Sequence, residues 1–530
     1  MHSPDKIPYP AGPEYARPSC SRASGIPVKQ INQPKFSLKR IIAITLLAIA
    51  ATSLTNAQSV SIGPNIIIIF TDDHGWADLG AIGVRDDIKT PHTDRLARMG
   101  TLFTSGYITA PQCRPSRAGL MSGRYQNRFG LEHNGNNGYP WSEYTIAERL
   151  RDAGYVTGHS GKWHLHGNVD STGKLPDGSD ASLEVIKAGI NNRLGLQDPG
   201  MAQHHGFTEH FTGAMNRYIA THSPDGKHLG GIVTYKDTRY RLDVQAEWSA
   251  DFIRRNAAKR RPFFLYTAFY APHVPLEVPP EYLERHSSDM PLRRRKALAM
   301  LSAIDDGVGL ILEALEDEAA KKNTLIFYIG DNGAPLKIHK WDQPGNGAGW
   351  NGSLNEPWTG EKGMLTEGGI RVPFIAYWHG CIPAGRIEER AVISMDAVAT
   401  ALVAAGLPLD DRIDGVDLLP YITGVKTGQV HDALYWRWAG QYAIRSGDWK
   451  YLKAGNREYL FDLASPNHEY ENLLDQQLDI AKRLKRQLIA WSEELLEPGF
   501  DHPVGYRGND YYDFYLDGKP ASISKAMLRE

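Results

Sequence analysis

Short, continuous apolar runs mark the chain at three places. The runs at 65–70, 262–270 and 324–329 hold few polar residues and show no polar alternation. Such runs are typical of strands that are buried on both faces of a parallel sheet. Each run is followed directly by polar residues, so we expect polar side chains to gather at the carboxyl ends of these strands.

Helical patterns lie between the apolar runs. Apolar residues recur at helical spacing from Met300 to Leu315, and Thr145 with Glu148 forms a capping box for a segment that stops at Gly154. Strands that alternate with helices predict an α/β fold, and open α/β sheets bind ligands at the carboxyl ends of their strands.

The pattern changes near residue 431. Short aromatic-rich runs separated by turn residues between 435 and 452 predict an antiparallel meander, and 478–496 has the pattern of an amphipathic helix. We therefore predict a catalytic domain at 58–430 and a small C-terminal α+β domain with a tail at 431–530.

Residues 1–57 have the pattern of a secretory signal peptide with a long N-terminal lead. Lys39 and Arg40 precede an apolar run from Ile41 to Ala51, and small residues follow as far as Ala57. The run is too short for a membrane-spanning helix, which needs roughly 20 apolar residues. We expect no retained membrane anchor, and export to the periplasm or the cell exterior.

The composition is that of an ordinary globular protein. The chain has 530 residues, of which 42% are hydrophobic, and a formal net charge of −2. Because there is no basic excess, no nucleic-acid partner is expected. Cys20 would leave with the signal peptide, so only Cys113 and Cys381 remain. This count excludes a disulfide scaffold and a zinc site built from cysteines.

Two polar clusters follow predicted strands and supply hard oxygen donors. Asp72 and Asp73 follow the first strand, and Asp331 and Asn332 follow a later one. Three carboxylates and an amide suit Ca²⁺ or Mg²⁺ better than a thiophilic metal. Asp-Asp and Asp-Asn-Gly are also common turn sequences, so on these residues alone a turn remains the alternative.

The segment around Cys113 resembles a known signature. Cys113 lies just ahead of a predicted helix with Pro115 in its first turn, and a buried free thiol is the plain alternative. The segment 113–117, CRPSR, closely resembles the CxPSR signature of the type I sulfatases. Five further segments occur in that family's order: TDDHGW at 71–76, GKWHLHG at 161–167, APHVP at 271–275, GDNG at 330–333 and EKGMLTEGGIRVP at 361–373.

The resemblance implies a fold and a cofactor. The fold is an alkaline-phosphatase-like sandwich with a large, mostly parallel sheet flanked by helices, and with a small antiparallel sheet in the C-terminal domain. In the family, the cysteine is converted during export to Cα-formylglycine, whose hydrate offers one hydroxyl to attack sulfur and another to expel sulfate. Asp72, Asp73, Asp331 and Asn332 are implied to hold one Ca²⁺ together with residue 113.

The resemblance also implies roles for cationic residues. Arg117 would hold the formylglycine side chain, and Lys162 and Lys362 would contact sulfate oxygens, where positive charge stabilises an anionic transition state. His164 would take a proton near residue 113, and His273 would protonate the leaving sugar oxygen or, alternatively, contact the sulfate. Structural roles as surface cations or core imidazoles are the alternatives.

Two further histidines stand in these motifs. His166 in GKWHLHG departs from the family, which more often has glycine directly after the leucine. It would place an additional imidazole at the mouth of the site, or have no role. His74, after the aspartate pair, is familiar in the family and is expected behind the metal ligands.

Two loops are candidates for reading the substrate. They are 132–139 and 334–360, and the second contains Trp and Asn residues that include Asn355 and Trp358. Trp and Asn suit sugar rings, which have an apolar face and many hydroxyls; a glycine-rich surface cover is the alternative. We expect a sulfated oligo- or polysaccharide. The chain is similar to bacterial polysaccharide sulfatases such as the carrageenan sulfatases, with glycosaminoglycans and ulvan left open.

Three partner or function questions follow from the resemblance. Maturation would require a formylglycine-generating enzyme or an anaerobic sulfatase-maturing enzyme. One alternative function is a phosphate mono- or diesterase of the same superfamily, whose dinuclear members need a second set of Asp and His ligands. The other is an unmatured homologue that binds sulfated glycan and keeps Cys113 as a thiol.

Overall fold

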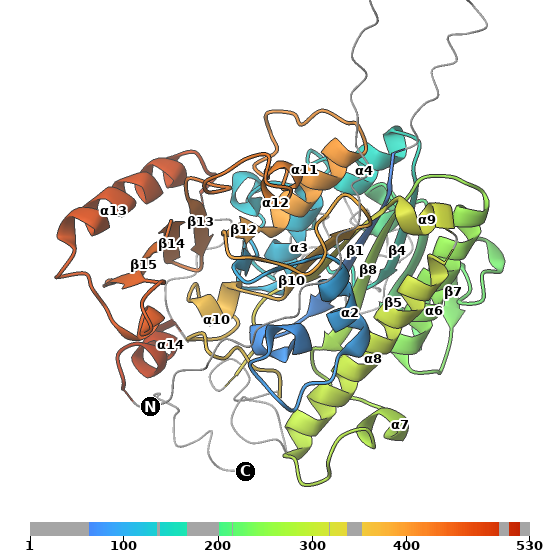
Figure 1. The fold of residues 1–530 in the computed structure, drawn as a ribbon, viewed down its shortest axis with the longest axis horizontal. Helices are drawn as coiled ribbons and strands as arrows, with labels where there is room; N and C mark the ends of the chain where they lie inside the picture. Colours follow the sequence, from blue (N-terminus) through green and yellow to red (C-terminus); the bar gives the residue numbers. More distant parts are fainter. Residues whose placement is uncertain are drawn as a thin grey trace, which may run out of the picture. The chain divides into compact units, whose positions relative to one another are not determined.

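The computed structural model describes residues 63–134, 138–166, 201–214, 216–316, 318–336, 352–497 and 508–519 (Figure 1). The predicted signal peptide lies outside the described residues, as do the middle parts of both predicted substrate loops. No helix within the described ranges is long and apolar enough to cross a bilayer. The prediction of export is not tested by the structure.

A ten-stranded mixed sheet forms the centre of the fold. Its strand order is β11-β2-β10-β9-β1-β8-β4-β5-β6-β7. The adjacent strands from β9 to β5 are parallel, whereas β10, β6 and β7 pair in antiparallel fashion. The strands are β1 (Asn65–Asp72), β2 (Thr101–Phe103), β4 (Val156–Gly161), β5 (Glu209–Ala214), β6 (Arg217–His222), β7 (His228–Lys236), β8 (Phe263–Pro272), β9 (Thr324–Gly330), β10 (Phe374–Trp378) and β11 (Arg386–Glu388).

Both faces of the sheet are covered, which explains the unbroken apolar run in β1. Ile66, Ile68 and Phe70 belong to one core, and Ile67 and Ile69 belong to another. Alternate side chains of a strand point to opposite faces, so each face of β1 requires apolar residues. The first core contains residues of α3 (Cys113–Ser122), α4 (Ile146–Asp152) and α11 (Ser394–Ala404), and the second contains residues of α2 (Pro91–Met99), α6 (Arg241–Ala258) and α8 (Leu292–Ala314).

The predicted helices are confirmed in place. The periodic segment that begins at Met300 runs along α8 and ends at the C-cap residue of that helix, Leu315. At the start of α4, Glu148 N donates to Thr145 Oγ1 at 3.0 Å and Thr145 N donates to Glu148 Oε2 at 2.8 Å, which completes the capping box. Short elements include α7 (Pro280–Leu283), α9 (Glu318–Lys322), α10 (Glu367–Ile370), α12 (Leu419–Ile422), β3 (Gly106–Tyr107) and β12 (Val392–Ile393).

A second, antiparallel sheet follows near the C-terminal end. Its four strands are consecutive in sequence: β13 (Leu434–Trp438), β14 (Gln441–Ser446), β15 (Trp449–Ala454) and β16 (Arg457–Asp462). Helix α13 (Leu478–Glu493) supplies Leu484 and Leu488 to the core that this sheet shares with one face of the large sheet. The predicted fold class is therefore confirmed, while the domain boundary at 430/431 remains a prediction.

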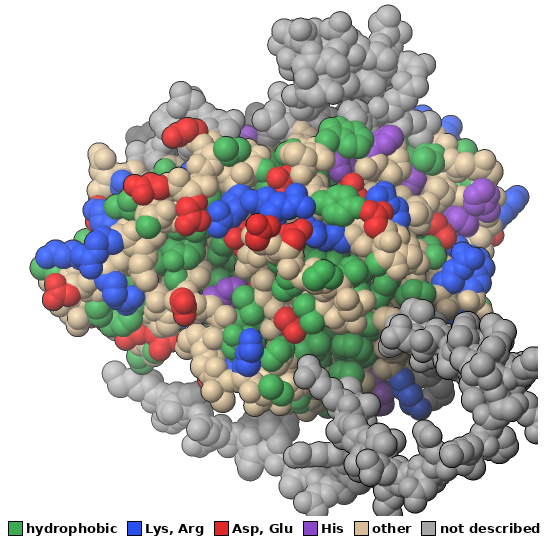
Figure 2. Space-filling view, turned by 90° about the horizontal axis from the view of Figure 1, so that it is seen from above, with side chains coloured by type: hydrophobic (Ala, Val, Ile, Leu, Met, Phe, Trp, Pro, Cys, Tyr) green, Lys and Arg blue, Asp and Glu red, His purple; other side chains and the backbone are tan. Residues whose placement is uncertain are grey.

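Charges of both signs are mixed on the surface. On the face drawn in Figure 2, Lys and Arg side chains lie among Asp and Glu side chains, with apolar groups between them. Arg239 with Asp237 (2.8 Å) and Arg285 with Asp306 (2.8 Å) are examples in which the arginine is exposed. The near-neutral net charge thus arises from near-equal numbers of both signs.

Candidate active site

The two polar clusters meet at the carboxyl edge of β1 and β9, because these strands are parallel neighbours. Asp73 N donates to Asp331 Oδ1 at 2.9 Å, and Asn332 Nδ2 donates to Asp73 Oδ1 at 2.7 Å. All four side chains, including that of Asp72, are fully buried. The structure therefore brings together the four residues that were predicted as metal ligands.

Cys113 is the first residue of α3 and faces these carboxylates. Its Sγ lies 3.4 Å from Asp72 Oδ1, and the residue is 1% exposed. Pro115 stands in the first helical turn, where its missing N–H leaves no hydrogen bond unmade. Potential ligand atoms of Asp72, Asp73, Cys113 and His273 all lie within 4.8 Å of one another.

The three predicted cations converge on the same carboxylates. Arg117 Nη2 is 2.7 Å from Asp331 Oδ2, and Lys162 Nζ is 2.6 Å from Asp72 Oδ2. Lys362 Nζ contacts Asp73 and lies 3.0 Å from Cys113 Sγ. These contacts join segments that are up to 289 residues apart in the sequence.

Burial and charge set the protonation states of the site. Burial, reinforced by the Asp72 carboxylate, raises the pKa of Asp331 to about 7. Burial opposes ionisation of Asp72, but Lys162 and the other cations outweigh it and hold the pKa of Asp72 well below its usual range. Burial and the Asp331 carboxylate raise the pKa of the Cys113 thiol to about 12. An unmodified thiol is therefore protonated here and is a poor nucleophile.

The donor set fits a hard divalent cation. It consists of three buried carboxylates and the amide of Asn332, whose Oδ1 is buried and makes no hydrogen bond to any described residue. A buried polar atom without a partner is costly, and a cation would satisfy it. Burial, the main cause of the raised pKa of Asp331, disfavours its ionised form, which a bound cation would stabilise.

The two predicted catalytic histidines both lie at the site as neutral rings. His273 Nε2 is 3.6 Å from Asp73 Oδ2 and its Nδ1 is 2.6 Å from Val274 O, and burial lowers its pKa to about 4. His164 has a left-handed backbone (φ 57°), and burial next to Lys162 holds its pKa well below the usual range.

The remaining motif histidines differ in their surroundings. The ring of His166 lies 6.5 Å from that of His164, centroid to centroid, and its pKa is lowered by burial to about 4. His74 is buried behind the aspartates, where its Nε2 is 2.8 Å from Asp78 O and its Nδ1 is 3.2 Å from Thr71 Oγ1. His74 thus lies behind the aspartates, as expected, and its hydrogen bonds support the turn after β1.

The sequence analysis missed two residues at the site. Tyr266 in β8 accepts a hydrogen bond from Arg117 Nη1 at 3.2 Å, and Arg114 Nε donates to His164 O at 3.1 Å. Arg114 directly follows Cys113, so it ties the start of α3 to the loop that carries His164. Neither role could be predicted from spacing, since both depend on contacts between distant segments.

The described part of the 334–360 loop serves to stabilise the fold. The centroid of the Trp358 ring lies 3.7 Å from the guanidinium carbon of Arg371. Asn355 Oδ1 accepts a hydrogen bond from Ala334 N at 2.8 Å, and Asn355 Nδ2 donates to Ala334 O at 2.9 Å. For Trp358 and Asn355 the structure therefore favours a surface cover, the alternative to sugar binding. The other Trp and Asn candidates of this loop lie outside the described residues.

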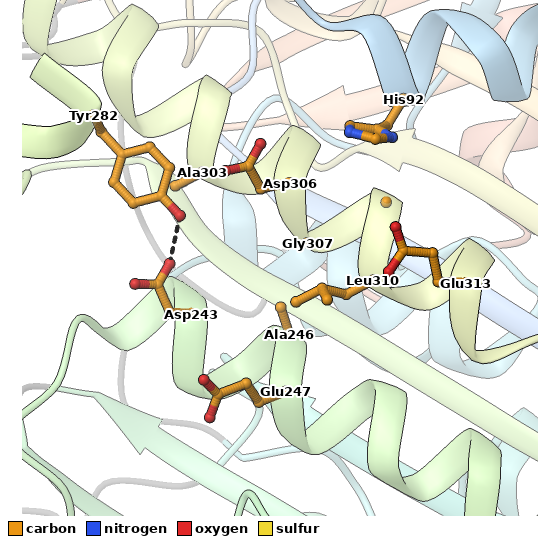
Figure 3. A pocket seen from close by; sticks show the side chains of 11 residues that line it. His92, Asp243, Ala246, Glu247, Tyr282, Ala303, Asp306, Gly307, Leu310 and Glu313 are labelled. Carbon is orange, nitrogen blue, oxygen red and sulfur yellow. Dashed lines mark hydrogen bonds between the residues drawn. The ribbon is translucent and has the colours of Figure 1, made fainter. Parts of the chain in front are cut away.

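A separate cavity lies between α2, α6 and α8 (Figure 3). It has a volume of about 390 Å³, and Asp243 in its wall accepts a hydrogen bond from Tyr282 at 2.7 Å. His92, Asp305 and Asp306 form the second His and carboxylate group found among the described residues. This cavity contains none of the predicted site residues and is not part of the site.

Comparison with known proteins identifies the family. The sequence profile of the sulfatase family matches residues 64–407. The chain belongs to the sulfatase family. The C-terminal profile of N-sulphoglucosamine sulphohydrolase matches residues 358–494, which include the four-stranded sheet. This sulfatase is therefore a sulfuric ester hydrolase, as the motifs predicted.

Similar proteins include enzymes from animals and a solved structure with a bound glycan. The sulfatase is 34% identical to N-acetylgalactosamine-6-sulfatase of Canis lupus familiaris, over 76% of this chain and 74% of the relative. It is 32% identical to arylsulfatase G of Rattus norvegicus, over 70% and 71% of the two chains. The structure of Ps i-CgsB in complex with k-i-k-neocarrahexaose has a TM-score of 0.68 and 28% identity, covering 85% of this chain and 97% of that one.

Proposed function

We propose that this sulfatase hydrolyses sulfate monoesters of a sulfated glycan, with Cys113 matured to formylglycine and one Ca²⁺ beside it. The observation that carries the proposal is the position of Cys113 Sγ, 3.4 Å from Asp72 Oδ1 and 3.0 Å from Lys362 Nζ. Residue 113 thus lies between the oxygen donors of a cation and the ammonium group of a lysine. A bound cation and this ammonium group would both stabilise the negative charge of an ester group at that position.

Asp72, Asp73, Asp331 and Asn332 would hold the cation, since their oxygen atoms face one another in a buried cluster. A bound divalent cation supplies Lewis acidity toward an ester oxygen, and the formylglycine hydrate supplies a hydroxyl nucleophile at position 113. The buried thiol that is encoded there has a pKa raised to about 12, so it does not supply an anionic nucleophile at neutral pH.

The chain's own cations have distinct tasks in this proposal. Lys162 and Lys362 bind sulfate oxygens, and Arg117 holds the side chain at position 113 while it neutralises Asp331. His164 accepts a proton near residue 113. We propose that His273 donates a proton to the leaving sugar oxygen from Nε2, which requires the protonated ring. Burial lowers the pKa of this ring to about 4, and the Asp72 and Asp73 carboxylates oppose that shift only in part.

A leaving-group test separates the two roles considered for His273. If it protonates the leaving oxygen, His273→Ala slows poor leaving groups far more than good ones, because good leaving groups need no acid. If it contacts the sulfate, the loss is equal for both.

We propose sulfated galactose-type sugars as the substrate class, with carrageenan oligosaccharides as the first candidates. Two relatives support this: one is named for N-acetylgalactosamine, and the other binds a carrageenan fragment. Glycosaminoglycans and ulvan provide the comparison substrates. We also propose that residues 1–57 are removed on export to the periplasm or cell exterior, which N-terminal sequencing of the secreted protein would check.

The test is sulfate release from a panel of sulfated oligosaccharides by enzyme matured with a formylglycine-generating enzyme or an anaerobic sulfatase-maturing enzyme. We expect release from at least one galactose-type sugar, none from Cys113→Ala, and full activity from the matched control Cys381→Ala. Activity confined to small aryl sulfates would overturn the glycan proposal. Release of phosphate from phosphate esters in place of sulfate would favour the esterase alternative, and glycan binding without turnover would favour the unmatured homologue.

A further inference from the structure

The loop that carries Lys362 is held by backbone hydrogen bonds to two parts of the site. Lys362 N donates to Ala334 O at 3.2 Å, and Gly363 N donates to Pro111 O at 2.9 Å. Ala334 follows the metal-ligand cluster after β9, and Pro111 lies two residues before Cys113. The position of this loop therefore determines where the ammonium of Lys362 stands relative to residue 113.

Gln441, the first residue of β14 in the C-terminal sheet, contacts this loop on its other side. Its Nε2 donates to Gly363 O at 2.9 Å, and its Oε1 accepts from Leu365 N at 3.1 Å. A single amide group thus satisfies a backbone acceptor and a backbone donor, one and three residues beyond Lys362. Gln441 is 1% exposed, so water does not replace these bonds if the amide is removed.

The amide of Gln441 is itself held in one orientation. The hydroxyl of Tyr512, in α14 (Gly508–Tyr515), donates to Gln441 Oε1. Oε1 accepts hydrogen bonds from two donors and Nε2 donates to a carbonyl oxygen, so only one of the two orientations of the amide satisfies all three partners. The C-terminal sheet and α14 therefore present a fixed donor and acceptor pair to the Lys362 loop.

We infer that Gln441 is a positioning residue that acts through Lys362 and sets the affinity of the site for the sulfate group. Lys362 has a long, flexible side chain, and it is buried between Asp73 and Cys113. The ammonium group of Lys362 binds an anion well only if the backbone of this residue is held in place. A displacement of about 1 Å at such a site weakens the interaction strongly. The inference rests on the proposed function, which assigns sulfate binding to Lys362.

A general contribution of Gln441 to domain contact is the competing explanation, and the chain offers a matched control. Tyr125 OH accepts a hydrogen bond from Tyr435 N in β13 at 3.2 Å. Tyr125→Phe removes one hydrogen bond between the same sheet and the rest of the fold, and among the described residues Tyr125 makes no hydrogen bond to the Lys362 loop. It should reproduce a loss of stability without a loss of sulfate affinity.

The test is a thermodynamic cycle on the full chain with Cys113 unmodified. Binding of inorganic sulfate in the presence of Ca²⁺ is measured by calorimetry for the wild type, Gln441→Met, Lys362→Met and the double variant. We expect Gln441→Met to weaken sulfate binding about tenfold, and to have no further effect once Lys362 is replaced, since residues that act through each other are not additive. Tyr125→Phe should remain within twofold of the wild type.

Each outcome decides the question. The inference would be overturned if Gln441→Met left the sulfate affinity unchanged. It would also be overturned if Gln441→Met lowered the affinity by the same factor in the wild type and in Lys362→Met. Either result would leave the proposed function intact. A wild-type chain that binds no sulfate with Ca²⁺ would overturn the assignment of sulfate binding to Lys362 and, with it, this inference, whereas the proposed hydrolysis is tested separately on the matured enzyme. If Gln441→Met does not fold, Tyr512→Phe, which removes only the hydroxyl that orients the amide, should lower the affinity in the same direction, and unchanged affinity would contradict the inference.

Discussion

Lys450, in β15 of the C-terminal sheet, is buried between two glutamates, and its replacement should destabilise the protein strongly. Its Nζ lies 2.8 Å from Glu367 Oε1 and 2.9 Å from Glu469 Oε1, and all three side chains are fully buried. Lys450→Met leaves two carboxylates without this cation. Breaking a buried ion pair by removal of one partner costs about 3–5 kcal/mol.

The pKa values of the two carboxyl groups show which ionised group is destabilised more when Lys450 is removed. Burial disfavours ionisation of Glu367, but Lys450 and Arg371 outweigh it and lower its pKa to about 2, and Arg371 remains after the replacement at 3.1 Å. Burial raises the pKa of Glu469 to about 7 despite Lys450. A raised pKa in the folded state contributes stability that is present below the ordinary value of 4.5 and is lost as the pH rises through 7. The loss in Lys450→Met should therefore be larger at pH 8 than at pH 5.

Urea unfolding followed by fluorescence measures this loss. We expect about 3–5 kcal/mol for Lys450→Met at pH 8, with partial recovery when Glu469→Gln is added, because the second change removes the unpaired charge. The matched control is Lys485→Met, which removes a partly exposed pair with Glu458 at 2.6 Å and should cost under about 1 kcal/mol. A loss below about 1 kcal/mol for Lys450→Met, or no recovery by Glu469→Gln, would refute the reasoning.

Three further predictions concern stability and metal binding. Thr145→Ala removes the capping box of α4 and should cost about 0.5–2 kcal/mol in urea unfolding; no change would show that the cap is dispensable. His431, with Nε2 2.9 Å from Asp396, has a raised pKa because the carboxylate outweighs burial, so its stabilisation is complete below pH 6.5 and is lost as the pH rises through the raised value. His431→Gln should abolish that pH dependence, and an unaltered profile would assign it to other groups. Ca²⁺ at about 100 times its Kd should stabilise the wild type by about 2.7 kcal/mol, whereas Asn332→Ala should need more Ca²⁺ for the same shift, and equal titrations would exclude Asn332 as a ligand.

Much of the fold was predictable from the sequence because it depends on local pattern. The unbroken apolar run of β1 required a strand covered on both faces, and the Thr145 box fixed the start of α4. The motifs also named the residues that gather at the site. The contacts between these residues were harder to predict, since Lys362 and Asp73 are 289 residues apart and meet only in the folded chain.

Other features had no signal in the sequence. A glutamine at the start of a strand, such as Gln441, does not differ in pattern from any polar residue, although its amide holds two backbone groups of the Lys362 loop. Trp358 looked like a candidate for sugar binding, but it packs against Arg371. Tyr266 was predicted only as part of a buried strand, and its hydroxyl accepts a hydrogen bond from Arg117. Such roles depend on long-range neighbours that local periodicity does not encode.

The mass of the peptide that contains position 113 tests the central claim most directly. The chain is produced together with a formylglycine-generating enzyme, digested with trypsin and measured by mass spectrometry, with the same chain produced without that enzyme as the control. Conversion of the Cys113 thiol to the aldehyde removes about 18 Da, and we predict this loss only in the coproduced sample. A thiol that persists at position 113 despite a competent maturing enzyme would contradict the account.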